Sequence, residues 1–261
     1  INIMIRVIRR YLKYNIISSM RIRSYADALS DIKANGQWLF KKGSDELPFL
    51  CTIRRGILGK SQIIRRIHRA ALKYKEVFVG NTFMFVFNND YFEVMFKKSS
   101  FMHLTGVASC LKADDFYNHA LTERGIRPGE IFFNEDHPYD LADKKTSILI
   151  GLGDITIKDS SVAMGIETKT FSYKLGVANL KFTVCLGDDK NSLGEIQGKC
   201  KVPYSFRVEG ISDTKSDDIY SVSHVLRKKT GEKKYHILTY GDRNALKDLN
   251  KDIQEKIALD E

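Results

Sequence analysis

Apolar and polar residues alternate with two different periods along this chain, and the helical period comes first. Between residues 61 and 74 the apolar positions recur at helical spacing, and Ser61 is a suitable N-cap. The pattern predicts an amphipathic helix with one apolar and one basic face. The apolar face consists of Ile63, Ile64, Ile67, Ala70 and Ala71, and the basic face of Arg65, Arg66, Arg69 and Lys73.

Four other segments have helical spacing. Residues 3–22 place arginines between apolar residues and predict a basic amphipathic helix, which either packs against the domain or binds a partner. Short helices are predicted over residues 24–33 and 113–122. In the last segment Leu246, Leu249, Ile253 and Ile257 share one face, so we expect a helix that closes over the sheet or docks a partner.

The period changes to that of β-strands after residue 82. Residues 83–87 and 91–97 are aromatic and β-branched, and Asn88, Asn89 and Asp90 supply the turn of a hairpin. Because the later joints are short, we expect antiparallel pairing. Further strands are predicted over residues 147–152, 169–175, 180–186, 194–202, 219–226 and 234–240. The fold class is therefore α+β, an antiparallel β-sheet with flanking helices.

The net charge differs sharply between the first 75 residues and the rest of the chain, although no linker marks a boundary there. Residues 1–75 hold 17 Lys and Arg against 4 Asp and Glu, a net charge of +13, whereas the other 186 residues have a net charge of −3. We therefore expect a basic, mainly helical region over residues 1–75 and an α+β domain over residues 76–261. A concentrated positive field attracts nucleic acid, anionic membrane or an acidic protein, and does not choose among them.

Composition narrows the class of protein. Hydrophobic residues make up 43% and charged residues 28%, which are globular proportions. The four cysteines lack metal-ligand or paired spacing, so we expect free buried thiols, no metal and no cofactor. No apolar run is long enough to span a membrane, and arginines interrupt the apolar start, so we expect neither membrane contact nor secretion and predict a cytoplasmic protein.

His103 is the first candidate for chemistry. It lies with Thr105 between apolar anchors just after the predicted hairpin. An imidazole can act as a general base near neutral pH. The alternative is a buried histidine held by a backbone carbonyl, with Thr105 and Gly106 shaping a turn.

Ser205 and Arg207 are the second candidate. Pro203 fixes the backbone before Ser205, whose hydroxyl is suited to a phosphate oxygen, and Arg207 falls on the same face of the strand. The alternative is simply the start of a strand.

The third candidate is the basic pair before the last predicted strand. Lys233 and Lys234 could bind phosphate, and Tyr235 could stack on a base or stabilise phosphate. A solvated hairpin end would have the same composition.

These segments together resemble a nuclease family. The resemblance rests on the aromatic hairpin at 83–96, FMHLTGV at 101–107, KADDFYNHAL at 112–121, VPYSF at 202–206 and DIYSVSHVLRKKTGEKKYHIL at 218–238. They are similar to the fourth family of the PBECR group, the phage-type relatives of the barnase, EndoU, colicin E5/D and RelE nucleases. The similar region covers about residues 76–240, so the basic N-terminal region lies outside it.

The resemblance implies a BECR-type nuclease fold, metal-independent RNA cleavage and carriage on a phage or mobile element as a toxin or effector. The matching positions imply roles for His103, Ser205, Tyr220 and Tyr235. Our hypothesis is that a ribose 2′-hydroxyl, activated by His103 or aligned by the fold, attacks the neighbouring phosphate while Ser205, Arg207 and Lys234 stabilise the charge.

We expect the RNA backbone to be held by basic residues, namely Arg65, Arg66, Arg69, Lys73, Arg207 and Lys233. Alternatively, the N-terminal region would engage an acidic antitoxin or immunity protein. The alternatives are a non-catalytic nucleic-acid-binding or regulatory protein of the same fold, and a protein that binds an acidic partner.

Overall fold

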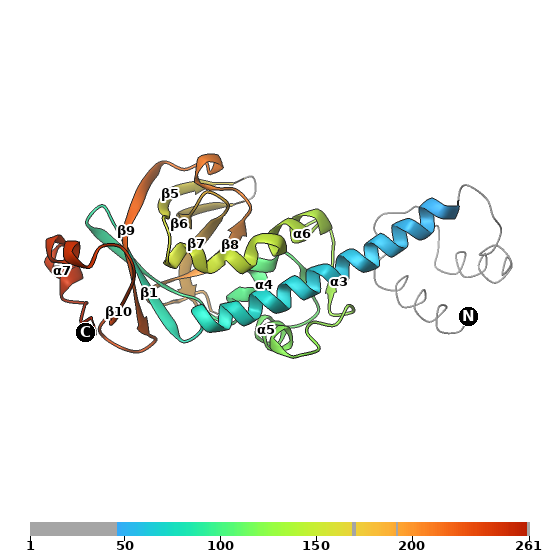
Figure 1. The fold of residues 1–261 in the computed structure, drawn as a ribbon, viewed down its shortest axis with the longest axis horizontal. Helices are drawn as coiled ribbons and strands as arrows, with labels where there is room; N and C mark the ends of the chain where they lie inside the picture. The colour runs from blue at the N-terminus through green and yellow to red at the C-terminus, as the bar shows by residue number, and fades with distance from the viewer. Residues whose placement is uncertain (1–45, 169–170, 192, 260–261) are drawn as a thin grey trace.

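The computed structural model describes residues 46–168, 171–191 and 193–259 (Figure 1). The helices predicted over residues 3–22 and 24–33 lie outside the described residues. A long helix, α3 (Glu46–Val77), leads into the body of the molecule. None of the helices described is long and apolar enough to cross a membrane.

Seven strands form a closed circuit of pairings. The order runs β1, β2, β8, β7, β6, β5, β9 and back to β1, and β10 adds to the second half of β9. The bounds are β1 (Asn81–Phe87), β2 (Asp90–Met95), β5 (Ser161–Glu167), β6 (Ser172–Ala178), β7 (Thr183–Lys190), β8 (Ile196–Arg207), β9 (Asp218–Lys229) and β10 (Ile237–Tyr240). Two short strands, β3 (Ala108–Ser109) and β4 (Ile131–Phe132), pair separately.

The expected antiparallel sheet needs one correction. β2 and β8 pair in parallel, with Val94 opposite Lys201, whereas all other neighbouring strands are antiparallel in the part of the chain described. The connection between β2 and β8 includes helices and five strands, which is long enough for a parallel crossover. The sheet is therefore mixed and mostly antiparallel.

β1 is the central strand of the core because both of its faces are covered. Phe83, Phe85 and Phe87 point into the main core with the helices, whereas Met84 and Val86 point into a second core under the C-terminal segment. The period of two along a strand explains this division. All seven residues of β1 are buried.

The helices cover the main core. They are α3, α4 (Ser100–Thr105), α5 (Ala113–Leu121), α6 (Tyr139–Ile148) and the 3₁₀ segment η2 (Leu149–Thr156). α3 packs against α5, α6 and η2, and α4 packs against β8 (Figure 1). In α3, the predicted apolar face is confirmed, because Ile63, Ile67 and Ala71 are buried in the main core.

The charge boundary near residue 76 does not coincide with the end of an element. α3 runs through Glu76 without a break, and its residues from Ile63 to Tyr74 contribute to the core that the sheet shares. The basic face of α3 is therefore attached rigidly to the body. That attachment fixes where its cations lie relative to the strands.

Three predicted elements were wrong in type or length. The helix predicted to begin with Ser61 as its N-cap begins at Glu46, so Ser61 lies inside α3. Residues 147–152 are the end of α6 and η2, not a strand, because Ala142, Thr146 and Leu149 bury one helical face. The C-terminal segment forms the short η4 (Arg243–Asp248) and α7 (Lys251–Gln254), because Asn250 caps a new helix at Ile253 N. Its predicted packing is confirmed, since Leu246 and Ile253 are buried against β1 and β9.

Candidate functional site

A β-bulge sets the direction of the side chains at the end of β8. Cys185 of β7 lies opposite Ser205, and Leu186 lies opposite Pro203, so Tyr204 is an extra residue in β8. A bulge re-aims the residues beside it. Phe206 points into the main core, and Ser205 and Arg207 share the other face. The predicted shared face is therefore confirmed.

Four further residues lie near Ser205 and Arg207, and we call the six residues together the Arg207 cluster. Its members come from four segments of the chain: α6, β6, β7, and β8 with the turn that follows it. They are Lys145, Tyr173, Cys185, Ser205, Arg207 and Glu209. Groups brought from separate elements to one point, with shifted pKa values, mark a candidate functional site.

Arg207 is fixed by a two-pronged ion pair. Its Nε lies 2.7 Å from Glu209 Oε2, and its Nη2 lies 3.0 Å from Oε1. Glu209 is held in turn because its carbonyl accepts a hydrogen bond of 2.9 Å from Thr183 Oγ1. The Glu209 bond raises the pKa of Arg207. Two of the five guanidinium N–H groups are used in this pair, so the others remain available to a ligand in a defined orientation.

The hydroxyl groups of Tyr173 and Ser205 lie near each other. Burial raises the pKa of Tyr173, and Ser205 acts to lower it by less, so the phenol stays protonated at neutral pH. Burial also raises the pKa of Cys185 to about 12, which keeps its thiol neutral and removes it as a nucleophile. The cluster thus offers hydroxyl donors beside a fixed guanidinium.

Lys145 adds a second cation to the cluster. Its aliphatic stem crosses Gly106, where a Cβ would lie 2.7 Å from Lys145 Cδ. Burial lowers the pKa of Lys145, and the charge of Arg207 lowers it further. Within the described residues, its ammonium group makes no hydrogen bond or ion pair. With one carboxylate for two cations, the cluster has an excess positive charge that an anion would neutralise.

A cleft of about 360 Å³ opens beside Arg207. Its lining includes Thr214, the exposed ion pair of Glu167 and Lys215, the carboxylates of Glu209 and Asp213, and the apolar Ile166. A cleft beside a charged cluster gives a ligand access to Arg207 without opening the core. The arrangement can bind a tetrahedral oxyanion and donate several hydrogen bonds to it.

His103 lies on α4, which packs against β8. It is exposed, so it is not the buried histidine of the alternative interpretation. Burial of part of the ring and then the charge of His137 lower its pKa below the ordinary value of 6.5. The ring is therefore neutral at pH 7 and able to accept a proton.

The turn after His103 explains the rest of this motif. Thr105 Oγ1 donates to the Met102 carbonyl at 2.7 Å, and Gly106 ends α4 with φ at +74°. That region favours glycine, and a side chain there would also collide with Lys145. Gly106 therefore connects the end of α4 to the Arg207 cluster.

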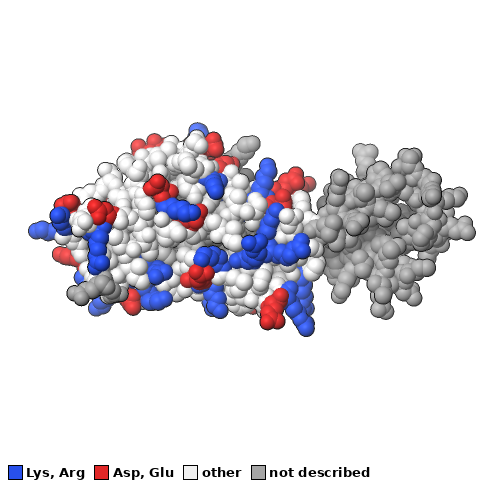
Figure 2. Space-filling view, in the orientation of Figure 1, with Lys and Arg blue, Asp and Glu red and all other residues white. Residues whose placement is uncertain are grey.

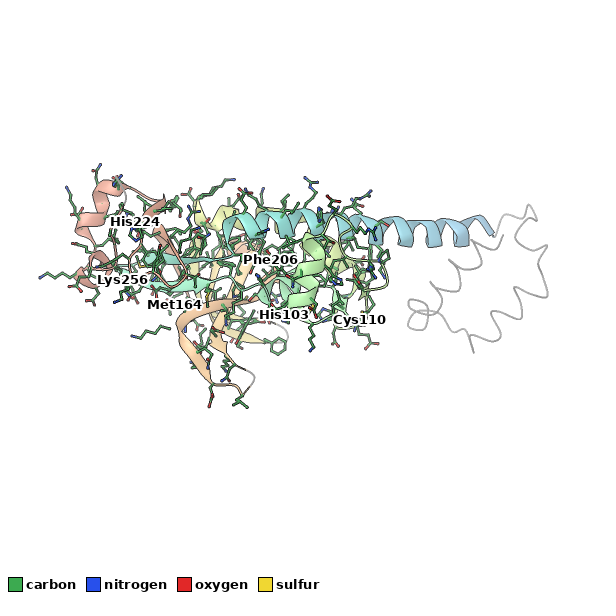
Figure 3. The ribbon with its side chains drawn as sticks, turned by 90° about the horizontal axis from the view of Figure 1, so that it is seen from below. His103, Cys110, Met164, Phe206, His224 and Lys256 are labelled. Carbon is green, nitrogen blue, oxygen red and sulfur yellow. The ribbon has the colours of Figure 1, made fainter. Side chains whose placement is uncertain are left out.

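Lys234 and Tyr235, which were predicted to act together with Ser205, do not lie near it. Tyr235 is buried in the second core, where its hydroxyl donates to Glu93 at 2.7 Å, and Lys234 donates to the carbonyl of Glu255. Figure 3 labels His103 and Phe206 in the middle of the body and Lys256 at one end of it. Tyr235 lies beside Lys256, because its backbone N–H donates to the Lys256 carbonyl. Among the predicted catalytic residues, Lys234 and Tyr235 therefore belong to a different part of the molecule from Ser205.

Tyr220 and Lys233 have different surroundings. Tyr220 of β9 packs against Phe87, with 5.7 Å between ring centroids. Lys233 is exposed in the turn between β9 and β10. Neither residue is among the groups whose charges act on Arg207.

The basic face of α3 is partly paired. Arg65 and Arg69 are exposed, Arg66 Nη1 lies 2.7 Å from Asp143 Oδ1 of α6, and Lys73 Nζ lies 2.7 Å from Glu76. Lys and Arg side chains gather over α3 in Figure 2. The Arg66 pair connects α3 to α6, the helix that carries Lys145.

Lys145, Tyr173 and Glu209 were not predicted from the sequence. Lys145 was hidden because residues 147–152 were interpreted as a strand, which removed the helical phase that separates Lys145 from Lys144. Glu209 could have been found from its spacing two residues after Arg207. Tyr173 offered no local signal, because its contact with Ser205 depends on the strand order.

Comparison with known proteins identifies the class of protein as a nuclease. A family model described as phage-Barnase-EndoU-ColicinE5/D-RelE like nuclease4 matches residues 66–244, which is more than half of the chain. This chain therefore belongs to that family, as its sequence motifs predicted. The match includes the end of α3 and all six residues of the Arg207 cluster. No curated protein and no solved structure matches the chain significantly.

Proposed function

We propose that this chain is a metal-independent endoribonuclease whose active site is the Arg207 cluster. The observation that carries the proposal is the convergence of two cations, Lys145 and Arg207, with the hydroxyls of Ser205 and Tyr173, next to a cleft that Arg207 lines. Membership of a nuclease family makes a phosphodiester the anion that such a cluster would bind. The cytoplasm is the compartment in which we expect it to act.

The proposed reaction is a transesterification. The ribose 2′-oxygen forms a bond to phosphorus while the bond from phosphorus to the 5′-oxygen breaks. The products are a 2′,3′-cyclic phosphate and a 5′-hydroxyl. The 2′-proton passes to His103, and the leaving 5′-oxygen takes a proton. Fixed donors aimed at the phosphoryl oxygens stabilise the charge that develops there.

The surroundings of Ser205 favour a nucleophile supplied by the substrate. Its hydroxyl lies near that of Tyr173, and no basic side chain that the structure describes accepts its proton. A serine without an adjacent base is a weak nucleophile. Ser205 is then a hydrogen-bond donor to the phosphate, and RNA is the substrate because DNA lacks the 2′-hydroxyl.

The experiment is incubation of the purified protein in EDTA with an RNA oligonucleotide and with the DNA of the same sequence. We expect RNA fragments with 2′,3′-cyclic phosphate ends and intact DNA. Arg207→Ala should reduce the rate roughly 100- to 1,000-fold, as for loss of a donor to a transition-state oxyanion. Arg124→Ala, at an exposed arginine after α5, is the matched control and should cut normally.

Two results would contradict the proposal. Cleavage of DNA at the rate of RNA would exclude the 2′-hydroxyl as nucleophile. Binding of RNA without any fragments would favour a non-catalytic nucleic-acid-binding protein of the same fold.

We further propose that the nuclease acts as a toxin or effector of a phage or mobile element and that an acidic antitoxin or immunity protein binds it. Membership of a phage-type family supports the first part, and the basic face of α3 supports the second. Induced expression in a bacterial host should arrest growth, and Arg207→Ala should abolish the arrest. Equal arrest by both proteins would argue against a nuclease toxin.

A further inference from the structure

Lys145 of the Arg207 cluster has no proton-transfer role in the reaction proposed above. Lys145 is a partly buried lysine whose ammonium group has no hydrogen-bonding partner among the described residues, and its charge interacts with that of the guanidinium that would hold the phosphate. Desolvating a cation without a partner is costly, so such a lysine usually has a functional reason. The remaining task in the reaction is to protonate the 5′-oxygen.

We propose that Lys145 is the general acid of the reaction and donates its ammonium proton to the leaving 5′-oxygen. This inference rests on the proposed function. The N–H bond of Lys145 breaks as the bond from phosphorus to the 5′-oxygen breaks, and the lysine becomes a neutral amine. The proton that His103 took from the 2′-hydroxyl returns to solvent, and Lys145 takes one up before the next turnover.

The geometry restricts Lys145 to this place. The aliphatic stem of Lys145 lies on Gly106, which ends α4 three positions after His103. Its charge interacts with Cys185 of β7, with Arg207 at the end of β8 and with Glu209 in the turn that follows. The proposed acid and base therefore come from two helices, α6 and α4, that pack against each other. An acid and a base on separate elements can act on opposite sides of one phosphate.

The charged neighbours favour proton donation. Burial lowers the pKa of Lys145 most, the positive charge of Arg207 lowers it further, and the negative charge of Glu209 opposes this more weakly. Cys185 of β7 stays neutral near pH 7, and Arg66 of α3 is paired with Asp143. A lowered pKa makes the ammonium a stronger acid than an exposed lysine, whereas the ammonium form still predominates below that pKa.

The test compares two substrates with one variant. The substrates are an RNA dinucleotide with an ordinary 5′-oxygen and the same dinucleotide with sulfur at the bridging 5′ position, which leaves as a thiolate without needing a proton. Lys145→Met keeps the length of the stem and removes the ammonium group. Lys144→Met, at the exposed neighbour on α6, is the matched control and should cleave both substrates normally.

We expect Lys145→Met to cleave the oxygen substrate roughly 100- to 10,000-fold more slowly than the wild type, and the sulfur substrate within about tenfold of it. An equal loss on both substrates would overturn the role as general acid, because a lysine that only binds phosphate acts on both. If the wild type cleaves neither substrate, the proposed nuclease function fails together with this inference.

A second variant, Gly106→Ala, tests the position of Lys145 without replacing the lysine. Gly106→Ala places a Cβ against Lys145 Cδ, whereas Gly80→Ala adds one where no atom lies within 4 Å. Both glycines have positive φ, so each variant should lose some stability from the left-handed backbone. Only Gly106→Ala should show the Lys145→Met pattern of a larger loss on the oxygen substrate. Equal cleavage of that substrate by the two glycine variants would contradict the assigned position of Lys145.

Discussion

At the scale of single residues, chemistry in this protein depends on how neighbours change a side chain that is ordinary by itself. Cys185 and Tyr173 are kept protonated by burial, so neither is available as an anion. Arg207 keeps one orientation because Glu209 holds two of its nitrogens. The hydroxyls and cations are then donors in fixed positions, which is what stabilisation of a phosphorane requires.

His103 gives a prediction at this scale. Its pKa lies below 6.5, so the neutral base form should persist to lower pH than in a fully solvated histidine. The kcat/KM for RNA cleavage should therefore fall on the acid side only below pH 6.5. His137→Gln removes the positive charge that lowers this pKa, so the acid limb should move to higher pH.

His103→Ala supplies the comparison for that profile. It should lose the acid limb and roughly 100- to 10,000-fold in rate. An acid limb that stays in place in both the His103→Ala and His137→Gln variants would belong to another group, and His103 would then not be the base.

At the scale of elements, the basic face of α3 is the part of the molecule suited to an RNA backbone. Arg65 and Arg69 are exposed on a helix whose opposite face is locked into the core. We expect the double variant Arg65→Gln, Arg69→Gln to weaken RNA binding and to reduce the slope of log affinity against log salt by about 1.4 for single-stranded RNA. Filter binding over a range of salt concentrations measures both quantities.

The control for α3 lies at the other end of the chain. Lys247 and Lys251 are exposed residues of the C-terminal segment, and their double Gln variant removes the same charge. If the two double variants change the salt slope equally, only net charge matters and α3 is not a specific binding surface.

The elements also show where prediction from sequence succeeds. The hairpin of β1 and β2 and the helix α5 were predicted almost to the residue, because their turn and spacing signals are local. β5 was missed because Ala163 and Gly165 weaken its strand pattern, and Gly165 has positive φ. The end of α6 was taken for a strand because an apolar run by itself does not distinguish a strand from a buried helix.

At the scale of the whole molecule, the closed order of strands decides which residues meet. Ser205 and Arg207 could be paired from sequence because they lie two residues apart on one strand. Tyr173 and Lys145 could not be added, since their approach depends on the pairing of β6 through β7 with β8 and on the packing of α6. The same topology takes Lys234 and Tyr235 to the second core, although their composition had suggested the site.

The central claim is that one phosphodiester of RNA binds between Arg207 and Lys145. The most direct measurement is a crystal structure with an RNA oligonucleotide that carries 2′-deoxyribose at the cleavage position, which prevents the reaction. We predict phosphate oxygens within about 3.2 Å of the Arg207 guanidinium and the Lys145 ammonium group, with His103 facing the 2′ carbon. A phosphate bound instead beside Lys233 and Lys234, with the Arg207 cluster empty, would contradict the claim.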